Sequence, residues 1–270
     1  MRWIVGDIHG MLRPLQSLVE AVGQLDTSPQ WIFVGDYVNR GPESRGVIDF
    51  LLPLTNARFC RGNHDDILDL IVNGISFAEQ PPQIDRPTAF RWFMEHGLSE
   101  TLASYGIRPA TMAAVLRHPT LAALDDLLSG IPQAHRNFLR NLQPTISDPD
   151  LFVTHAKWEI NRSDMHPDIP TSLEMEHELR RVVTWGRFTM EELDEPKVWH
   201  RIGYFGHTPV DNYGSRGGFD RRGGGKLIPI VANKLVLVDT AAALSPVGRL
   251  TAYCHDTPQF IQSDRQGNII

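Results

Sequence analysis

The stretch Val5-Gly6-Asp7-Ile8-His9-Gly10 (VGDIHG) joins an apolar run to an aspartate and a histidine near the start of the sequence. It overlaps the apolar run 3–5 (WIV), so a buried strand ends at once in a carboxylate and an imidazole, with a glycine on each side. Glycine lets the backbone turn sharply and lets a ligand approach closely. One such ending is usually only a turn, so the interpretation depends on whether the pattern recurs.

Polar side chains follow four more predicted strands in the same way. The apolar runs 31–34, 57–60, 151–153 and 202–205 predict strands. They lead into GDYVNRG (35–41), RGNHDD (61–66), THA (154–156) and FGHTP (205–209). Ligand sites of α/β sheets assemble just beyond the strand ends. We therefore expect one site built from Asp7, His9, Asp36, Asn63, His155 and His207.

These six side chains offer carboxylate, amide and imidazole donors without a thiolate. That donor set suits Mn, Fe or Zn better than calcium. Six ligands exceed what one closed site needs, but they suit two divalent ions that share a bridging carboxylate. Such a pair clamps the oxygens of an in-line displacement and lowers the pKa of a water between the ions.

Three further residues add the chemistry of phosphoryl transfer. Arg40 lies four residues after Asp36, and Arg187 lies in TWGRF (184–188). A lone arginine often forms only a surface salt bridge, but guanidinium groups also bind phosphate and neutralise transition-state charge. His64 follows the predicted ligand Asn63 and is the candidate general acid for the leaving group.

Composition favours a globular protein of the reducing cytoplasm. The chain has 270 residues, of which 41% are hydrophobic and 21% charged. Its net charge of −6 argues against broad nucleic-acid binding. No apolar run suggests a membrane helix, and we identify no signal peptide. The two cysteines, Cys60 and Cys254, are expected to be small core residues.

Strands alternate with helices in the first part of the chain. Helical spacing over 12–23, and more weakly over 46–52, separates the first strands and predicts a layered α/β domain. Two further strands are predicted at 227–231 and 235–238.

Residues 75–150 differ, because helical periodicity there is interrupted by prolines. We expect a helical insertion packed on a single domain of residues 1–270 and able to cover the mouth of the site. The glycine-rich stretch 214–226 predicts a mobile loop, with a lid that reaches phosphate as the alternative.

The motifs resemble the phosphoprotein phosphatase family of the calcineurin-like metallophosphoesterases. That family's pattern is GDxHG, GDxVDRG, GNHE, HAG or HGG, and then GHT. The resemblance covers about residues 1–65 and 150–255, in the family's order. It implies an α/β sandwich of two mixed β-sheets flanked by helices, with a dinuclear metal centre at the strand ends.

The resemblance also assigns roles. One metal takes Asp7, His9 and Asp36, and the other takes Asp36, Asn63, His155 and His207. Arg40 and Arg187 hold phosphate, and His64 is the acid. The expected cofactors are two divalent ions, manganese first, with iron or zinc as alternatives.

The chain departs from the family pattern at three positions. Asn39 stands where the motif has aspartate, which in the family pairs with the catalytic histidine and stabilises its protonated form. An amide orients His64 but supplies no charge, so we expect a weaker acid with a lower pKa. Asp65 replaces the glutamate of GNHE, and Lys157 stands beside the site, where it either attracts anions or points to solvent.

Three functional hypotheses follow from the resemblance. The first, which the sequence favours, is a phosphomonoesterase acting on phosphoserine or phosphothreonine, or on phosphotyrosine, because GHTPV (206–210) and 233–253 look like the protein-phosphatase branch. The second is a symmetrical diadenosine tetraphosphate hydrolase, whose GDxVARG pattern also lacks the aspartate. The third is a catalytically silent, metal-bound scaffold that docks phosphorylated partners. Expected partners are phosphorylated proteins or small phosphoesters, not nucleic acid or membrane, and we expect a monomer.

Overall fold

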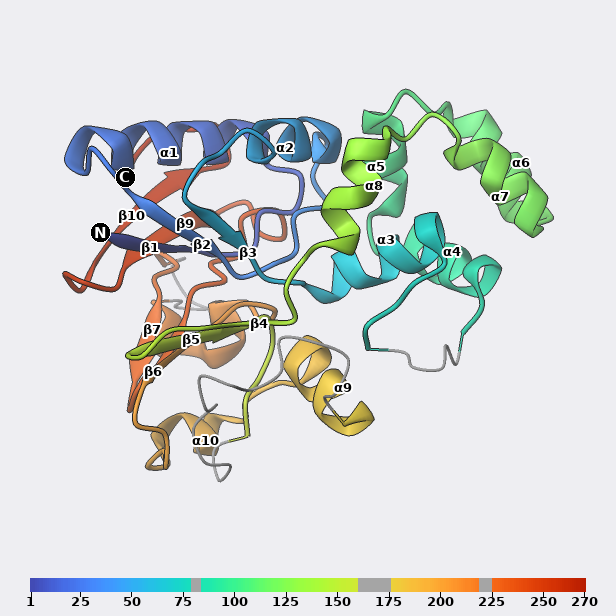
Figure 1. Cartoon of the computed structure of the whole chain (residues 1–270). Coiled ribbons are helices and arrows are strands. Elements are labelled where there is room, and N and C mark those ends of the chain that lie inside the picture. The colour runs from blue at the N-terminus through green and yellow to red at the C-terminus, as the bar shows by residue number, and fades with distance from the viewer. Residues whose placement is uncertain (79–83, 160–175, 219–224) are drawn as a thin grey trace.

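The computed structural model describes residues 1–78, 84–159, 176–218 and 225–270, in which two five-stranded sheets pack face to face (Figure 1). The first sheet has the order β10-β9-β1-β2-β3. Its strands are β1 (Arg2–Val5), β2 (Gln30–Phe33), β3 (Ala57–Phe59), β9 (Arg249–Cys254) and β10 (Gln259–Asp264). β1, β2 and β3 are parallel, whereas β9 and β10 pair antiparallel at one edge.

The second sheet has the order β4-β5-β6-β8-β7. Its strands are β4 (Thr145–Ser147), β5 (Leu151–Thr154), β6 (Ile202–Phe205), β7 (Ile230–Ala232) and β8 (Leu235–Leu237). β5, β6 and β8 are parallel and the two edge strands are antiparallel. Both sheets are mixed, so the predicted sandwich is confirmed.

Alternation along β1 builds the core between the layers. Trp3 and Val5 face the cluster that includes Leu15 of helix α1 (Leu12–Leu25), while Ile4 faces the other way, into a cluster with Tyr204 of the second sheet. All of these side chains are almost completely buried. Successive residues of a strand point to opposite faces of the sheet, so this one short strand contributes side chains to the core on both faces of the first sheet.

Helices flank the sandwich. α1 (Leu12–Leu25) and α2 (Ser44–Leu51) lie on the outer side of the first sheet, and α3 (Asn63–Asn73) follows β3 (Figure 1). Later in the chain come the helices α9 (His177–Trp185) and α10 (Met190–Asp194) and the 3-10 helix η1 (Val210–Gly217). The predicted loop 214–226 therefore begins inside η1, and its residues 219–224 lie outside the described part.

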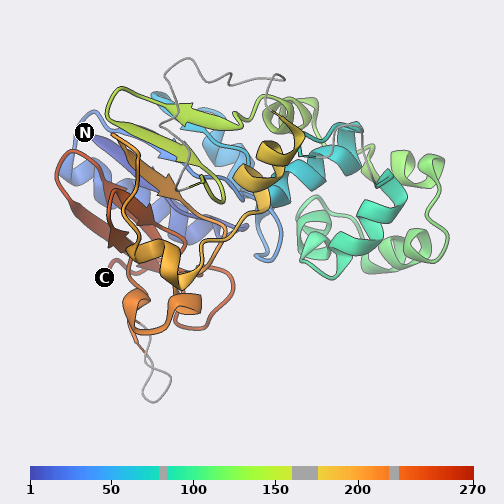
Figure 2. The ribbon, with the colours of Figure 1, turned by 90° about the horizontal axis from the view of Figure 1, so that it is seen from below.

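The described residues of the range 75–150 include five helices at one end of the sandwich (Figure 1). They are α4 (Arg86–Met94), α5 (Leu98–Ser104), α6 (Pro109–Arg117), α7 (Leu121–Leu128) and α8 (Gln133–Arg140). The last part of the range is not helical, because 145–147 forms β4, and 79–83 lie outside the described residues. Seen from below, α9 lies between the sandwich and these helices (Figure 2).

Several boundaries differ from the sequence prediction. The strand predicted at 227–231 begins only at Ile230, and β4, β9 and β10 were not predicted. Cys60 and Cys254 are free and buried, as expected of core residues. Among the described helices, none is both long and apolar enough to cross a membrane.

Candidate metal centre

The turns after five parallel strands bring the six predicted ligands together. Asp7 and His9 follow β1, Asp36 follows β2, and Asn63 opens α3 after β3. From the second sheet come His155 after β5 and His207 after β6. All six are buried, with exposed fractions of 0–8%.

The carboxylate of Asp36 lies between two imidazoles. Its Oδ2 is 3.3 Å from Nε2 of His9, and its Oδ1 is 3.5 Å from Nε2 of His155. The remaining ring nitrogens contact backbone carbonyls: Nδ1 of His9 lies 2.9 Å from Val38 O, and Nδ1 of His155 lies 3.0 Å from Val34 O. Metal-binding histidines commonly donate one ring N–H to such a carbonyl, which leaves the other nitrogen for the ion.

A second convergence point is the side-chain oxygen of Asn63. Nε2 of His155 lies 3.0 Å from Asn63 Oδ1, and Nδ1 of His207 lies 2.9 Å from the same atom. The backbone N–H of His207 donates to Asp7 Oδ2 at 3.0 Å. The two sheets are thus joined through the side chains of the site.

Glycine is required at two close approaches. A Cβ on Gly62 would lie 2.2 Å from Asp36 Oδ1, and one on Gly206 would lie 2.1 Å from Asp7 Oδ1. Neither carboxylate could keep its place beside a larger residue. The glycines of GNH and GHT therefore make room for these carboxylates.

Backbone strain is concentrated in the same turns. Five of the predicted site residues have φ between 48° and 70°, in the left-handed region: His9, Asp36, Asn39, Arg40 and His207. For residues other than glycine such a conformation costs roughly 1–3 kcal/mol each. The surrounding fold maintains that strain where these side chains meet, which is a common property of functional sites.

The donor set fits divalent cations. The ligand atoms of Asp7, Asp36 and His155 lie within 4.8 Å of one another, and so do those of His9, Asp36 and His64. Asp7 Oδ1 is buried and has no hydrogen-bond partner among the described residues. A buried, unpartnered carboxylate oxygen is costly unless a cation or donor satisfies it.

The electrostatics of the protein atoms alone point the same way. Burial and then the neighbouring Asp239 raise the pKa of Asp7 well above its usual value. Burial would also raise the pKa of Asp36, but three imidazoles, led by His155, hold it well below its ordinary range. Burial lowers the pKa of His155, but the carboxylates of Asp36, Asp7 and Asp65 together raise it to about 9. Divalent charge at this point would stabilise both carboxylates in their ionised form.

Asp239 was not predicted as a site residue. It follows β8, is 2% exposed, and its Oδ2 has no hydrogen-bond partner among the described residues. Burial raises its pKa to about 6. The signal was present, because Asp239 follows the predicted strand 235–238 in the way that Asp7 follows its own strand.

Asp65 connects two of the turns. Its Oδ2 accepts hydrogen bonds from the backbone N–H groups of Asp36 (2.7 Å) and Gly62 (3.0 Å), and its Oδ1 accepts one from Tyr37 (3.0 Å). The carboxylate therefore fixes the turn after β2 against the start of α3. The shorter side chain in GNHD still reaches these amides.

His64 contacts Asn39 rather than a carboxylate. Nδ2 of Asn39 lies 3.0 Å from Nδ1 of His64, and because an amide nitrogen only donates, Nδ1 accepts. Asn39 Oδ1 in turn accepts from the hydroxyl of Thr101 on α5 at 2.9 Å. Burial lowers the pKa of His64 well below its usual value.

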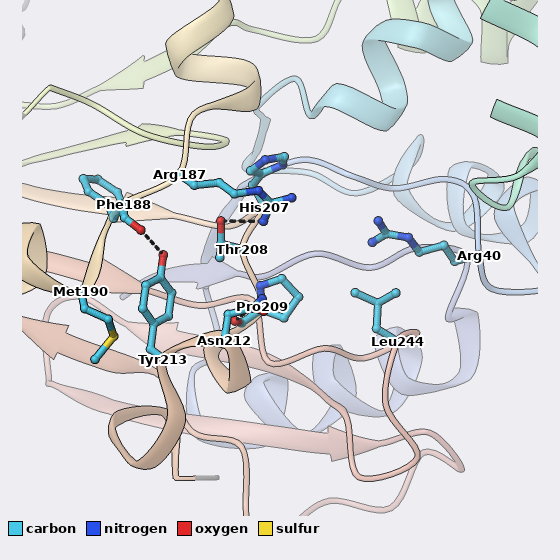
Figure 3. Close-up of a pocket in the computed structure, with 10 residues that line it drawn as sticks. All are labelled: Arg40, Arg187, Phe188, Met190, His207, Thr208, Pro209, Asn212, Tyr213 and Leu244. Carbon is cyan, nitrogen blue, oxygen red and sulfur yellow. Dashed lines mark hydrogen bonds between the residues drawn. The ribbon is translucent and has the colours of Figure 1, made fainter. Parts of the chain in front are cut away.

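The two predicted phosphate-binding arginines line one cavity of about 530 Å³ (Figure 3). Nη1 of Arg40 lies 2.5 Å from Nε2 of His9. Nη1 of Arg187 donates to Thr208 Oγ1 at 3.1 Å, beside His207. One predicted ligand, His207, also lines this cavity, and Arg40 on its wall contacts a second, His9.

Lys157 is not among the residues that line this cavity. Its ammonium lies 2.5 Å from a carboxylate oxygen of Glu192 on α10 and 5.6 Å from the centre of the Phe188 ring. The ion pair accounts for its charge. A lysine beside the site thus helps to hold α10 in place.

Comparison with known proteins gives partial relatives. Over 73 residues the chain is 41% identical to the symmetrical bis(5'-nucleosyl)-tetraphosphatase of Coxiella burnetii. The matched segment covers 27% of this chain and 25% of that protein. Over 64 residues it is 44% identical to the enzyme of that name from Ectopseudomonas mendocina, covering 23% and 24%. These matches span about a quarter of the length of the curated relatives.

A solved structure extends the likeness of the fold to nearly the whole chain. The crystal structure of a putative diadenosine tetraphosphatase superposes with a TM-score of 0.52 at 22% identity, over 97% of this chain and 91% of that one. Residues 2–211 match the family described as calcineurin-like phosphoesterase. Together with the sandwich and its buried His/Asp cluster, this match shows that the chain belongs to the calcineurin-like phosphoesterase family.

Proposed function

We propose that this protein is a metal-dependent phosphoryl hydrolase that prefers a nucleoside polyphosphate, such as diadenosine tetraphosphate, and cleaves its phosphoanhydride bond. Membership of the calcineurin-like phosphoesterase family supports hydrolysis of a phosphoester. The observation that favours this substrate is the contact between the uncharged amide of Asn39 and His64.

The metal-binding residues are proposed from the convergence described above. One ion would be held by Asp7, His9 and Asp36, and the other by Asp36, Asn63, His155 and His207. The approach of Asp36 to His9 and His155, and of Asn63 to His155 and His207, supports this assignment. Paired divalent ions held there would neutralise phosphoryl charge and make water a stronger nucleophile.

The remaining residues bind and orient the substrate. The guanidinium groups of Arg40 and Arg187 line the same cavity, where they can grip the phosphoryl oxygens and neutralise charge in the transition state. His64 presents an imidazole beside the ligands Asp36 and His9. Its contact with Asn39 holds the ring in one orientation.

Asn39 bears on the choice of leaving group. Water forms a new P–O bond and the bond to the leaving oxygen breaks. A serine or threonine alkoxide needs a proton as it departs, and a positively charged imidazole supplies it best. A phosphate anion leaves a phosphoanhydride without that help. Because the amide of Asn39 supplies no charge to stabilise an imidazolium at His64, the site is better suited to the phosphoanhydride.

A protein phosphatase is the second candidate. GHTPV (206–210) and the segment 233–253 resemble that branch of the family, and they favour phosphomonoesters. The silent scaffold is disfavoured, because Arg40, Arg187 and His64 all lie at the site and a docking module has no need of a proton donor.

A substrate panel tests the proposal. With Mn²⁺ supplied, we expect kcat/KM for diadenosine tetraphosphate to exceed that for phosphoserine and phosphothreonine peptides by about tenfold or more, with ADP as the product. The variant Asp36→Asn is the inactive control. Faster turnover of the phosphopeptides would replace the first candidate with the second.

A further inference from the structure

The cavity beside the metal centre has two chemically different ends (Figure 3). Arg40 and Arg187, with His207, line one side of it. Its volume of about 530 Å³ lies within the roughly 300–1,000 Å³ range of small-molecule sites. A bound phosphoryl group would occupy only the cationic end of this cavity. The other end leaves room for a further part of the ligand.

Two exposed apolar side chains flank the other end. Met190 on α10 is 42% exposed, and Leu244, in the segment after β8, is 48% exposed. They lie on opposite sides of the cavity, with Pro209 between them (Figure 3). Large apolar side chains left open to water on two sides of a cavity mark a surface that an apolar ligand would cover.

The wall between them is fixed. The hydroxyl of Tyr213 donates to the backbone oxygen of Phe188 at 3.1 Å, and both side chains are buried. Nδ2 of Asn212 donates to Pro209 O at 3.1 Å, and the same amide keeps Oδ1 as an acceptor. An amide is the kind of group that pairs with the edge of adenine.

We propose that this cavity binds the nucleoside of a nucleotide substrate, with its phosphates at Arg40 and Arg187 and its base between Met190 and Leu244. The ligand has to be anionic at one end and flat and apolar at the other, with a polar edge. A nucleotide has this chemistry, and the volume is larger than one phenyl ring needs. This inference rests on the proposed function and names where that substrate is held.

The test compares two probes that differ only in the nucleoside. Adenosine 5'-(α,β-methylene)diphosphate carries it and methylenediphosphonate does not, and neither contains a phosphoanhydride bond that can be hydrolysed. Calorimetry on the Mn²⁺-loaded protein measures both affinities. We expect the adenosine compound to bind about tenfold more tightly or better.

Substitutions locate the effect. Met190→Ser combined with Leu244→Ser should weaken the adenosine compound about tenfold and methylenediphosphonate less than about twofold. The matched control is Leu25→Ser combined with Leu121→Ser, which alters two exposed leucines of α1 and α7, 63% and 54% exposed, and should change neither affinity.

Three outcomes would overturn the assignment. They are equal affinity for the two probes, equal weakening of both by the double variant, or phenyl phosphate binding as tightly as the adenosine compound, which would indicate an aryl ester. The proposed function is separable. If the adenosine compound binds tightly and the double variant weakens it, but the tetraphosphate is not hydrolysed, the nucleoside pocket stands and the proposed activity is wrong. If the tetraphosphate is hydrolysed but the affinity does not depend on the nucleoside, the activity stands and the pocket assignment is wrong.

Discussion

Nδ2 of Asn39 donates a hydrogen bond of 3.0 Å to Nδ1 of His64, so the catalytic candidate of this chain is oriented by an amide. Thr101, in the helical insertion, positions this amide. Its hydroxyl donates to Oδ1 of Asn39 and accepts from the backbone N–H of Asn39 at 2.8 Å. Helix α5 therefore determines how the His64 ring is presented to the site.

Asn39→Asp should change the dependence of turnover on the leaving group. A carboxylate beside Nδ1 stabilises the protonated imidazole, so we expect kcat for a phosphoserine peptide to rise about tenfold. For p-nitrophenyl phosphate, whose leaving group departs readily, kcat should change less than about twofold. Steady-state kinetics on both substrates measure the ratio.

The control combines Asn39→Asp with His64→Asn, which should abolish the gain. An equal gain for both substrates, or a gain that survives without His64, contradicts the role assigned to Asn39. Thr101→Val should disturb the orientation of the Asn39 amide and of the His64 ring, whereas Thr101→Ser, which keeps the hydroxyl, should not.

Arg187→Lys should raise KM more than it lowers kcat for a substrate whose phosphate it holds. The lysine keeps the charge but loses the planar fork that binds two oxygens, so we expect KM to rise about tenfold. Arg181, which is exposed on α9, provides the matched control as Arg181→Lys. An unchanged KM for Arg187→Lys would place that guanidinium outside the binding site.

Acid stability should depend on Arg2, far from the metal centre. Arg2 on β1 donates to Asp150, just before β5, and to Asp256, so it ties the two sheets together. Hydrogen bonds from Arg2 hold the pKa of both carboxyl groups below the ordinary range. A carboxyl group whose pKa is lower in the folded than in the unfolded protein stabilises the fold at pH values above its unfolded pKa, which is about 3.9. That stabilisation is lost as the pH falls towards the lower pKa of the folded protein.

Arg2→Gln should therefore lower the urea midpoint of unfolding at about pH 7. The difference in midpoint between the variant and the wild type should become smaller below about pH 4. Both carboxyl groups are partly exposed, so the loss at pH 7 should be about 1 kcal/mol or less and should shrink in salt. A gap that widens in acid would contradict this account of the link between the sheets.

The sequence was most informative where buried strands end in polar residues. Asp7, Asp36 and His155 could be predicted because short apolar runs followed by glycine, aspartate or histidine identify both a strand and its functional end. The same rule applied to 235–238 would have included Asp239.

Other features have no local signal. Thr101 lies 62 residues from Asn39, in a helix whose periodicity says nothing about its contacts. The edge strands β4 and β10 were missed because β4 has three residues and β10 exposes much of its first half, so neither shows the buried apolar run of a central strand. Pairing with a neighbour determines such strands more than their own residues do.

If Asp36 binds two metal ions at once, as proposed, then the number of manganese ions bound per chain should depend on its carboxylate. Equilibrium dialysis of metal-stripped protein against Mn²⁺ should give two ions per chain for the wild type, with both affinities reduced at least about tenfold in Asp36→Asn. A single ion per chain, or two ions that remain tightly bound in Asp36→Asn, would contradict the account.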